Sequence, residues 1–176
     1  MGDGTLHGAS AVPATDAPLA EFASFHEGYL HNYVSLADTK ATVLLGLVGT
    51  FIAYLFSKPT FTAFLFKPAC TPSSWLAWAS IVLLAAGAGS AAWVVAPRLK
   101  TTGEGLVFFG AVRAHVDAAA YAAAVRSAGA NLLEDAWLRH CYDVSEVCWH
   151  KYQNLRRAIW LSIAGLVAAL PLLASI

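Results

Sequence analysis

Three long runs of the sequence carry no charged residue. They cover Ala41 to Ser57, Trp75 to Ala96 and Ala158 to Ile176. As helices of about 17, 22 and 19 residues, they are long enough to cross a bilayer, the first with Lys40 and Lys58 reaching the headgroups from its two ends. A soluble helical bundle is the alternative, but an uncharged run has no polar face to present to water. The pattern predicts an all-α integral membrane protein with three transmembrane helices.

The composition points the same way. Of the 176 residues, 58% are hydrophobic and 12% are charged, which is about half the charged fraction of an average soluble protein. Basic and acidic residues balance at 11 each and the basic ones do not line an exposed face, so nucleic acid is not expected as a partner. Residues 1–18 lack the features of a signal peptide and predict a flexible tail.

Basic residues resist translocation, so their distribution predicts the orientation of the spans. On one side of the second and third spans lie Arg98, Lys100, Lys151, Arg156 and Arg157. The other side carries Lys67 and an uncharged C-terminal end. The segment 97–157 and the N-terminus are therefore expected in the cytoplasm, and the C-terminus outside it.

Apolar stripes predict that two spans extend into the cytoplasm as long helices. At 100° per residue, one stripe joins Phe22, Phe25, Tyr29, Tyr33, Leu36, Lys40, Leu44 and Leu47. Another joins Leu133, Trp137, Cys141, Val144, Cys148, Tyr152, Leu155 and Ile159. Between them we expect an irregular connector over 97–110 and a helix over 112–128, with Gly129 as its stop and Asn131 as the cap of the next helix.

The predicted order of segments follows from these features. It is a tail (1–18), a cytoplasmic helix continuing into the first span (19–57), an extracytoplasmic loop (58–74), the second span (75–96), a cytoplasmic helical region (97–157) and the third span (158–176).

Small residues recur within the spans. They are Gly46, Gly49, Ala85, Gly87, Gly89, Ala91, Gly165 and Ala169. Such residues let helices approach closely in lipid, which fits packing within one subunit and self-association alike.

Few residues suggest chemistry. His140, Cys141, Cys148 and His150 are scattered around one helix without metal-ligand spacing, so we interpret them as core or surface residues. No motif for hydrolysis or phosphoryl transfer is present, and an enzyme is not expected. Arg98 and Lys100 beside a glycine turn could hold a phosphate, although these residues alone favour a basic flank and a connector.

The sequence ADTKA stands where the first span begins. Asp38 and Lys40 project to nearly opposite sides of a helix, so they do not pair with each other. Each needs a partner on another element or in the headgroups.

Three segments carry a resemblance to a known family. YVSLADTKATVLLGLVGTFIAYLF, PRLKTTGEGLVFFGAV and WHKYQNLRRAIWLSIAGL resemble the membrane effectors of Pycsar antiphage systems, over nearly all of the chain after the tail. The specific parts are ADTKA, PRL followed by GLVFFG, and K-Y-x-x-L-R-R-A, in this order relative to the spans.

The resemblance implies a bacterial inner-membrane protein. Its ligand would be cyclic UMP or cyclic CMP made by a partner cyclase, and its action would impair membrane integrity and arrest or kill the infected cell. In one respect the chain departs from what such a ligand suggests: a separate cyclic-nucleotide-binding domain is not expected, because it would need a strand-rich roll that this sequence does not supply. We expect a homo-oligomer in the lipid bilayer.

The ligand is expected in the cytoplasmic helical region, between subunits. Arg98, Lys100 or Arg113 would meet the phosphate, and Phe109 or Trp137 would lie near the base. Coupling or assembly is assigned to Asp38, Lys40 and Lys151, where the helices enter the membrane. A constitutive membrane scaffold without ligand gating is the alternative.

Overall fold

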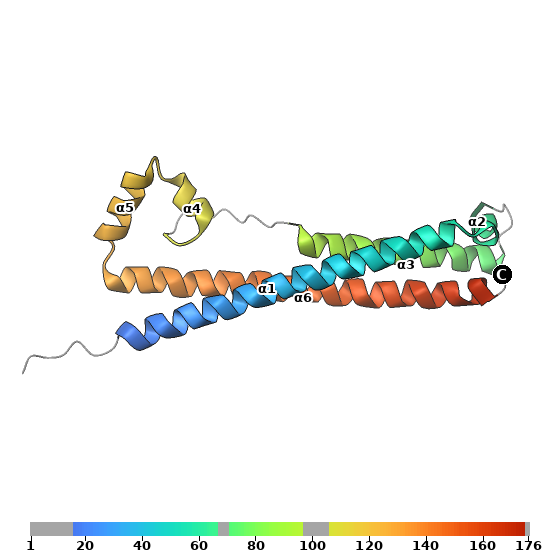
Figure 1. Cartoon of the computed structure of the whole chain (residues 1–176), viewed down its shortest axis with the longest axis horizontal. Coiled ribbons are helices and arrows are strands. Elements are labelled where there is room, and N and C mark those ends of the chain that lie inside the picture. The colour runs from blue at the N-terminus through green and yellow to red at the C-terminus, as the bar shows by residue number, and fades with distance from the viewer. Residues whose placement is uncertain (1–15, 67–70, 97–105, 175–176) are drawn as a thin grey trace, which may run out of the picture.

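Three long helices lie side by side in the computed structural model, which describes residues 16–66, 71–96 and 106–174 (Figure 1). They are α1 (Asp16–Phe56), α3 (Pro72–Val95) and α6 (Ala130–Ala174). Each is long and apolar enough to cross a membrane, α1 from Ser24 onwards. No strand occurs in the three described ranges, and the predicted all-α fold with three helices able to span a membrane is confirmed.

The long helices differ in length. At about 1.5 Å per residue, α3 is about 36 Å long, whereas α1 and α6 reach about 61 Å and 67 Å. All three run together at one end of the molecule, and α1 and α6 continue past the C-terminal end of α3 as a pair (Figure 1). A three-helix bundle therefore passes into a two-helix extension.

The local sequence explains where α3 begins. The side chain of Thr71 accepts a hydrogen bond from the backbone of Ser74, and Pro72 stands in the first turn, where a missing N–H costs nothing. The helix thus starts before the uncharged run at Trp75. A short helix, α2 (Pro59–Phe66), occupies part of the segment 58–74, and Phe61 and Leu65 are buried against the bundle.

The alanine-rich segment forms two helices, so the single helix expected over 112–128 is wrong. Helix α4 (Phe109–Ala114) and helix α5 (Ala118–Ser127) are separated by three residues, 115–117. The carboxylate of Asp117 accepts a hydrogen bond of 2.6 Å from the backbone of Ala120 and caps α5, which holds the chain extended before it. Asn131 is not the cap of α6, because the carbonyl of Gly129 accepts the first helical hydrogen bonds.

The tightest packing lies between α3 and α6. A Cβ atom on Gly87 would come within 2.5 Å of Ser162 Oγ, and one on Gly165 would come within 2.8 Å of Leu84 Cγ. The hydroxyl of Ser80 donates a 2.9 Å hydrogen bond to the Gly165 carbonyl across this contact. Half of the small residues singled out above therefore serve packing within one subunit: Gly87, Ala91, Gly165 and Ala169 are buried.

Helix α1 is rolled relative to its predicted stripe. Most of that stripe is exposed, including Phe22, Phe25, Tyr29, Tyr33, Leu36 and Leu47. The buried residues of α1 are instead Leu30, Ala37, Ala41, Val48 and Leu55, which repeat every seven or four positions. Aliphatic side chains, including Ala37 and Ala41, face the other helices, and the aromatic side chains of the predicted stripe face outwards.

Several predicted features lie outside the described residues. These are the tail up to residue 15, the end of the α2–α3 connection, and the connector from residue 97 to 105.

Candidate functional site

Lys151 is the one charged side chain buried within the described residues, with 6% of its surface exposed. Its ammonium group donates a hydrogen bond of 2.9 Å to the Val94 carbonyl of α3. It also donates to the Asp38 carboxylate of α1, which forms an ion pair with it. This coupling junction of Asp38, Val94 and Lys151 joins all three long helices at the level where α3 ends.

The end of α3 explains why a lysine is stable there. The last carbonyls of a helix lack intrahelical partners and carry a partial negative charge. Ala92 O accepts from the backbone of Ala96, and Val94 O accepts from Lys151. The carboxylate of Asp38 neutralises the buried ammonium, so the desolvation of Lys151 is offset by two partners.

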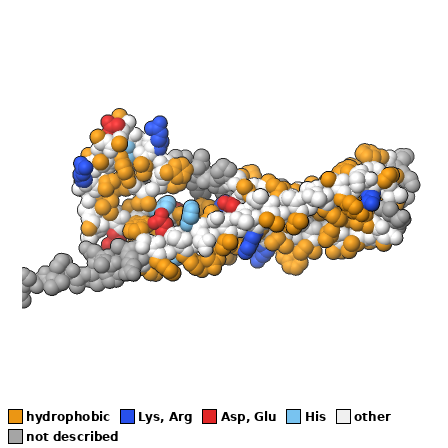
Figure 2. Space-filling view, in the orientation of Figure 1, with side chains coloured by type: hydrophobic (Ala, Val, Ile, Leu, Met, Phe, Trp, Pro, Cys, Tyr) orange, Lys and Arg blue, Asp and Glu red, His pale blue; other side chains and the backbone are white. Residues whose placement is uncertain are grey.

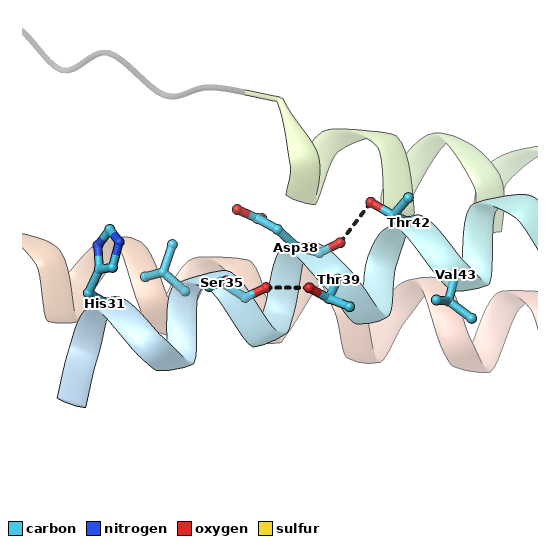
Figure 3. A pocket seen from close by; sticks show the side chains of 7 residues that line it. His31, Ser35, Asp38, Thr39, Thr42 and Val43 are labelled. Carbon is cyan, nitrogen blue, oxygen red and sulfur yellow. Dashed lines mark hydrogen bonds between the residues drawn. The ribbon is translucent and has the colours of Figure 1, made fainter. Parts of the chain in front are cut away.

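A hollow of about 490 Å³ opens beside the junction along α1. It is lined by His31, Val34, Ser35, Asp38, Thr39, Thr42 and Val43. Figure 3 shows the Asp38 carboxyl group and the His31 imidazole on the same side of α1, while two threonines bond back to carbonyls of their own helix. Because Asp38 would repel a phosphate, we do not assign the nucleotide to this hollow.

Lys40 is set apart from the other two residues expected to act in coupling. Its side chain is exposed, with the ammonium 6.0 Å from the centre of the Tyr152 ring on α6. Tyr152 in turn lies 6.2 Å from the Tyr33 ring of α1. The structure thus brings Asp38 and Lys151 together and leaves Lys40 one aromatic contact away, at the outer margin of the junction.

A second link between α1 and α6 lies in the two-helix extension. The indole Nε1 of Trp137 donates a 2.8 Å hydrogen bond to Glu27 Oε2. Both side chains are partly buried. The sequence analysis placed Trp137 near the base of the ligand. The N–H of its ring is therefore bonded to Glu27 within the protomer.

Replacing Trp137 by phenylalanine tests this link. The change keeps an aromatic ring but removes the donor to Glu27, so we expect the free energy of unfolding to fall by about 1–2 kcal/mol. Thermal unfolding of the purified protein in detergent measures the effect. Trp93→Phe is the matched control, because Trp93 is exposed on α3. Equal losses for both variants would contradict a specific role of the Glu27 hydrogen bond.

Helices α4 and α5 stand apart from the bundle, beside the first half of α6 (Figure 1). Phe109, with 63% of its surface exposed, begins α4, and the exposed Arg113 follows one turn later on the same face. The hydroxyl of Tyr121 on α5 donates a 2.9 Å hydrogen bond to Leu106 O and ties α5 to the segment before α4. Arg98 and Lys100 lie outside the described residues.

The sequence analysis named Lys151 but missed two members of these contacts. Glu27 and the Val94 carbonyl have no local signal, because their partners are far away in the chain. Lys151 did carry one: it follows Cys148 by three positions and precedes Leu155 by four, and all three are buried on one face of α6. A lysine within a buried stripe predicts an acidic partner elsewhere.

Comparison with known protein families gives one match. The Pycsar effector protein domain, PycTM, covers residues 22–176, which include the junction, α3, α4, α5, α6 and all but the first six residues of α1. The chain belongs to the Pycsar effector family. No curated protein and no solved structure matches significantly. A Pycsar antiphage effector with three span-length helices is a membrane protein of bacterial antiviral defence.

Within this Pycsar effector, the features above divide into two regions. The junction of Asp38 and Lys151 lies where three helices become two. Helix α4, which carries the exposed Phe109 and Arg113, stands apart from the bundle beside the first half of α6 (Figure 1).

Proposed function

We propose that this Pycsar effector is a cyclic-nucleotide-activated membrane protein that impairs the bacterial inner membrane and arrests or kills the infected cell. The family match over residues 22–176 carries the proposal. The ligand is cyclic UMP or cyclic CMP from a partner cyclase, and the effector acts without catalysis. Segment 97–157 and the N-terminus face the cytoplasm, and the C-terminus faces outwards.

The nucleotide binds at α4 and the connector before it. An exposed ring and an exposed guanidinium on one face of a short helix can stack on a base and pair with a phosphate. Arg98 and Lys100 on the connector add positive charge, and Trp137 offers the face of its ring. None of these functions needs a strand-rich domain.

The double change Arg98→Ala and Arg113→Ala tests the ligand site. We expect binding of the cognate nucleotide to weaken by about 100-fold, since two charge-assisted contacts are lost. Titration of the purified protein with cyclic UMP, cyclic CMP, cyclic AMP and cyclic GMP measures affinity and selectivity. Arg126→Ala in α5 is the control, and an unchanged affinity in a folded double variant would refute the assignment.

Assembly of several copies is supported by side chains that the protomer leaves uncovered. On the two-helix extension, large apolar residues are exposed: Phe22, Phe25, Tyr29, Leu36, Tyr142 and Trp149. Such side chains outside a membrane usually mark an interface. We propose that they pack against further copies of this chain and that the ligand binds between copies.

The conformational effect of nucleotide binding is transmitted to the membrane through α1 and α6. Both helices run from the extension into the bundle, and the junction of Asp38 and Lys151 ties them to the end of α3. A change in their relative position would alter the packing of all three spans. Loss of Asp38, Lys40 or Lys151 should therefore abolish the response while leaving nucleotide binding intact.

A cellular experiment distinguishes a nucleotide-gated effector from a constitutive scaffold. Cells that express the effector receive the partner cyclase's product, and growth and dye entry are recorded. A gated effector stops growth and admits dye when the nucleotide is present, whereas a scaffold does neither.

A further inference from the structure

Two adjacent arginines stand on α6 directly before its uncharged run. Arg156 and Arg157 line a hollow of about 410 Å³ between α3 and α6. Its other walls are Ser90 of α3 and Trp160 and Leu161 of α6. Both arginines are exposed, and Figure 2 shows Lys and Arg side chains at the level where the charged part of the molecule meets the uncharged bundle.

The positive charges of this arginine hollow are not neutralised by the protomer. Arg157 Nη1 donates a 3.4 Å hydrogen bond to Asn154 Oδ1, which is an uncharged acceptor. Among the ion pairs of the described part of the chain, neither arginine has a carboxylate partner. A hollow with two unpaired guanidinium groups favours an anion, and guanidinium suits the oxygens of a phosphate.

The position of the hollow indicates where the phosphate comes from. Trp160 is 66% exposed and lies one turn beyond Arg156, as indole rings do at the boundary between headgroups and acyl chains. Leu161 continues the wall towards the apolar span. A hollow that is cationic at its mouth and apolar below it fits a lipid better than a free anion.

We propose that the arginine hollow binds the headgroup phosphate of an anionic phospholipid. Arg156 and Arg157 meet the phosphate oxygens, and Trp160 lies against the start of an acyl chain. The bound lipid adds a contact between α3 and α6 on the membrane side of the junction. This site is separate from the nucleotide site on α4 and stands whether or not the nucleotide is the ligand.

Thermal unfolding of the full-length protein in a zwitterionic detergent tests the site. The protein is titrated with short-chain phosphatidylglycerol, short-chain phosphatidylcholine, inorganic phosphate or cyclic UMP. Phosphatidylglycerol should raise Tm, because a ligand that binds the folded state stabilises it. Phosphatidylcholine and inorganic phosphate should not do so at the same concentrations.

The double variant Arg156→Gln and Arg157→Gln should bind phosphatidylglycerol about thirty-fold more weakly. The matched control, Arg126→Gln and Arg139→Gln, removes the same charge from exposed positions elsewhere and should bind like the wild type. Should the glutamine variant fail to fold, Arg156→Lys and Arg157→Lys keeps the charge but loses the planar donors, and should bind with intermediate affinity.

Three results would overturn the assignment. One is an equal loss of phosphatidylglycerol binding in the control, because charge alone would then explain the effect. Another is stabilisation by inorganic phosphate as strong as that by the lipid. The third is an increase in Tm with cyclic UMP that is lost in the Arg156 and Arg157 variants, which would make the hollow a nucleotide site.

Discussion

Replacing Lys151 by alanine is expected to lower the free energy of unfolding by about 3 kcal/mol and to abolish growth arrest. The change leaves the Val94 carbonyl and the Asp38 carboxylate without their shared donor. The loss falls at the lower end for a broken buried ion pair, because the Asp38 side chain is 36% exposed and water can reach it. Thermal unfolding in detergent, together with growth on exposure to the nucleotide, measures both effects.

Paired substitutions separate the two roles of Lys151. The double change Asp38→Asn and Lys151→Met removes both charges and should recover most of the lost stability without restoring the response. The exchange Asp38→Lys and Lys151→Asp keeps an ion pair but sets a carboxylate against the Val94 carbonyl, so it should remain unstable. Lys40→Ala is the control for stability, since Lys40 is exposed. An exchange variant as stable as the wild type would show that the contact with α3 contributes little.

Gly165→Ala is expected to destabilise the protein by about 1–3 kcal/mol through overpacking. Its methyl group would lie 2.8 Å from Leu84 Cγ and 3.0 Å from the Leu84 backbone nitrogen. Since a backbone atom cannot rotate away, α3 and α6 must separate, and the hydrogen bond from Ser80 to the Gly165 carbonyl lengthens.

Gly89→Ala on α3 is the matched control, because no atom lies within 4 Å of the added methyl group. We expect it to be neutral or to stabilise the helix by about 1 kcal/mol, as alanine favours helix over glycine. Unfolding of both variants in the same detergent compares them. A similar loss for Gly89→Ala would mean that glycine at these positions serves something other than contact between α3 and α6.

The three spans could be predicted because their signal is local. An uncharged run of about 17–22 residues has few stable alternatives, so Ala41 to Ser57 and the two later runs indicate membrane helices without knowledge of their neighbours. Proline at position 97 likewise marks the end of the second span. The order of the segments followed from these signals alone.

The contacts between helices could not be predicted in the same way. Asp38 and Lys151 are 113 positions apart, and neither local sequence predicts which residue will be the partner. The stripe on α1 was found, but a stripe does not say which side faces the bundle. Its aromatic side chains have more surface to bury than Ala37 and Ala41, yet the alanines are buried because they let helices approach.

The break between α4 and α5 was missed for another reason. Alanines on both sides of it favour helix, and one residue, Asp117, decides the outcome by capping the second helix. The nucleotide-site residues on α4 were named from the sequence, and their role stays a prediction. Two of the five ligand residues named from the sequence, Arg98 and Lys100, lie on the connector outside the described ranges.

The close contact of α3 with α6 has a mechanical consequence. Gly87 and Gly165 let these two helices pack in close contact, whereas a Cβ atom added to Gly28, Gly46 or Gly49 of α1 would meet no atom of another element within 4 Å. Helices α3 and α6 therefore resist sliding past each other and form a rigid pair. Helix α1 is held to this pair by small apolar side chains and by the ion pair of Asp38 with Lys151. We expect a conformational change in the two-helix extension to tilt or rotate α1 relative to α3 and α6, about its contact with Lys151.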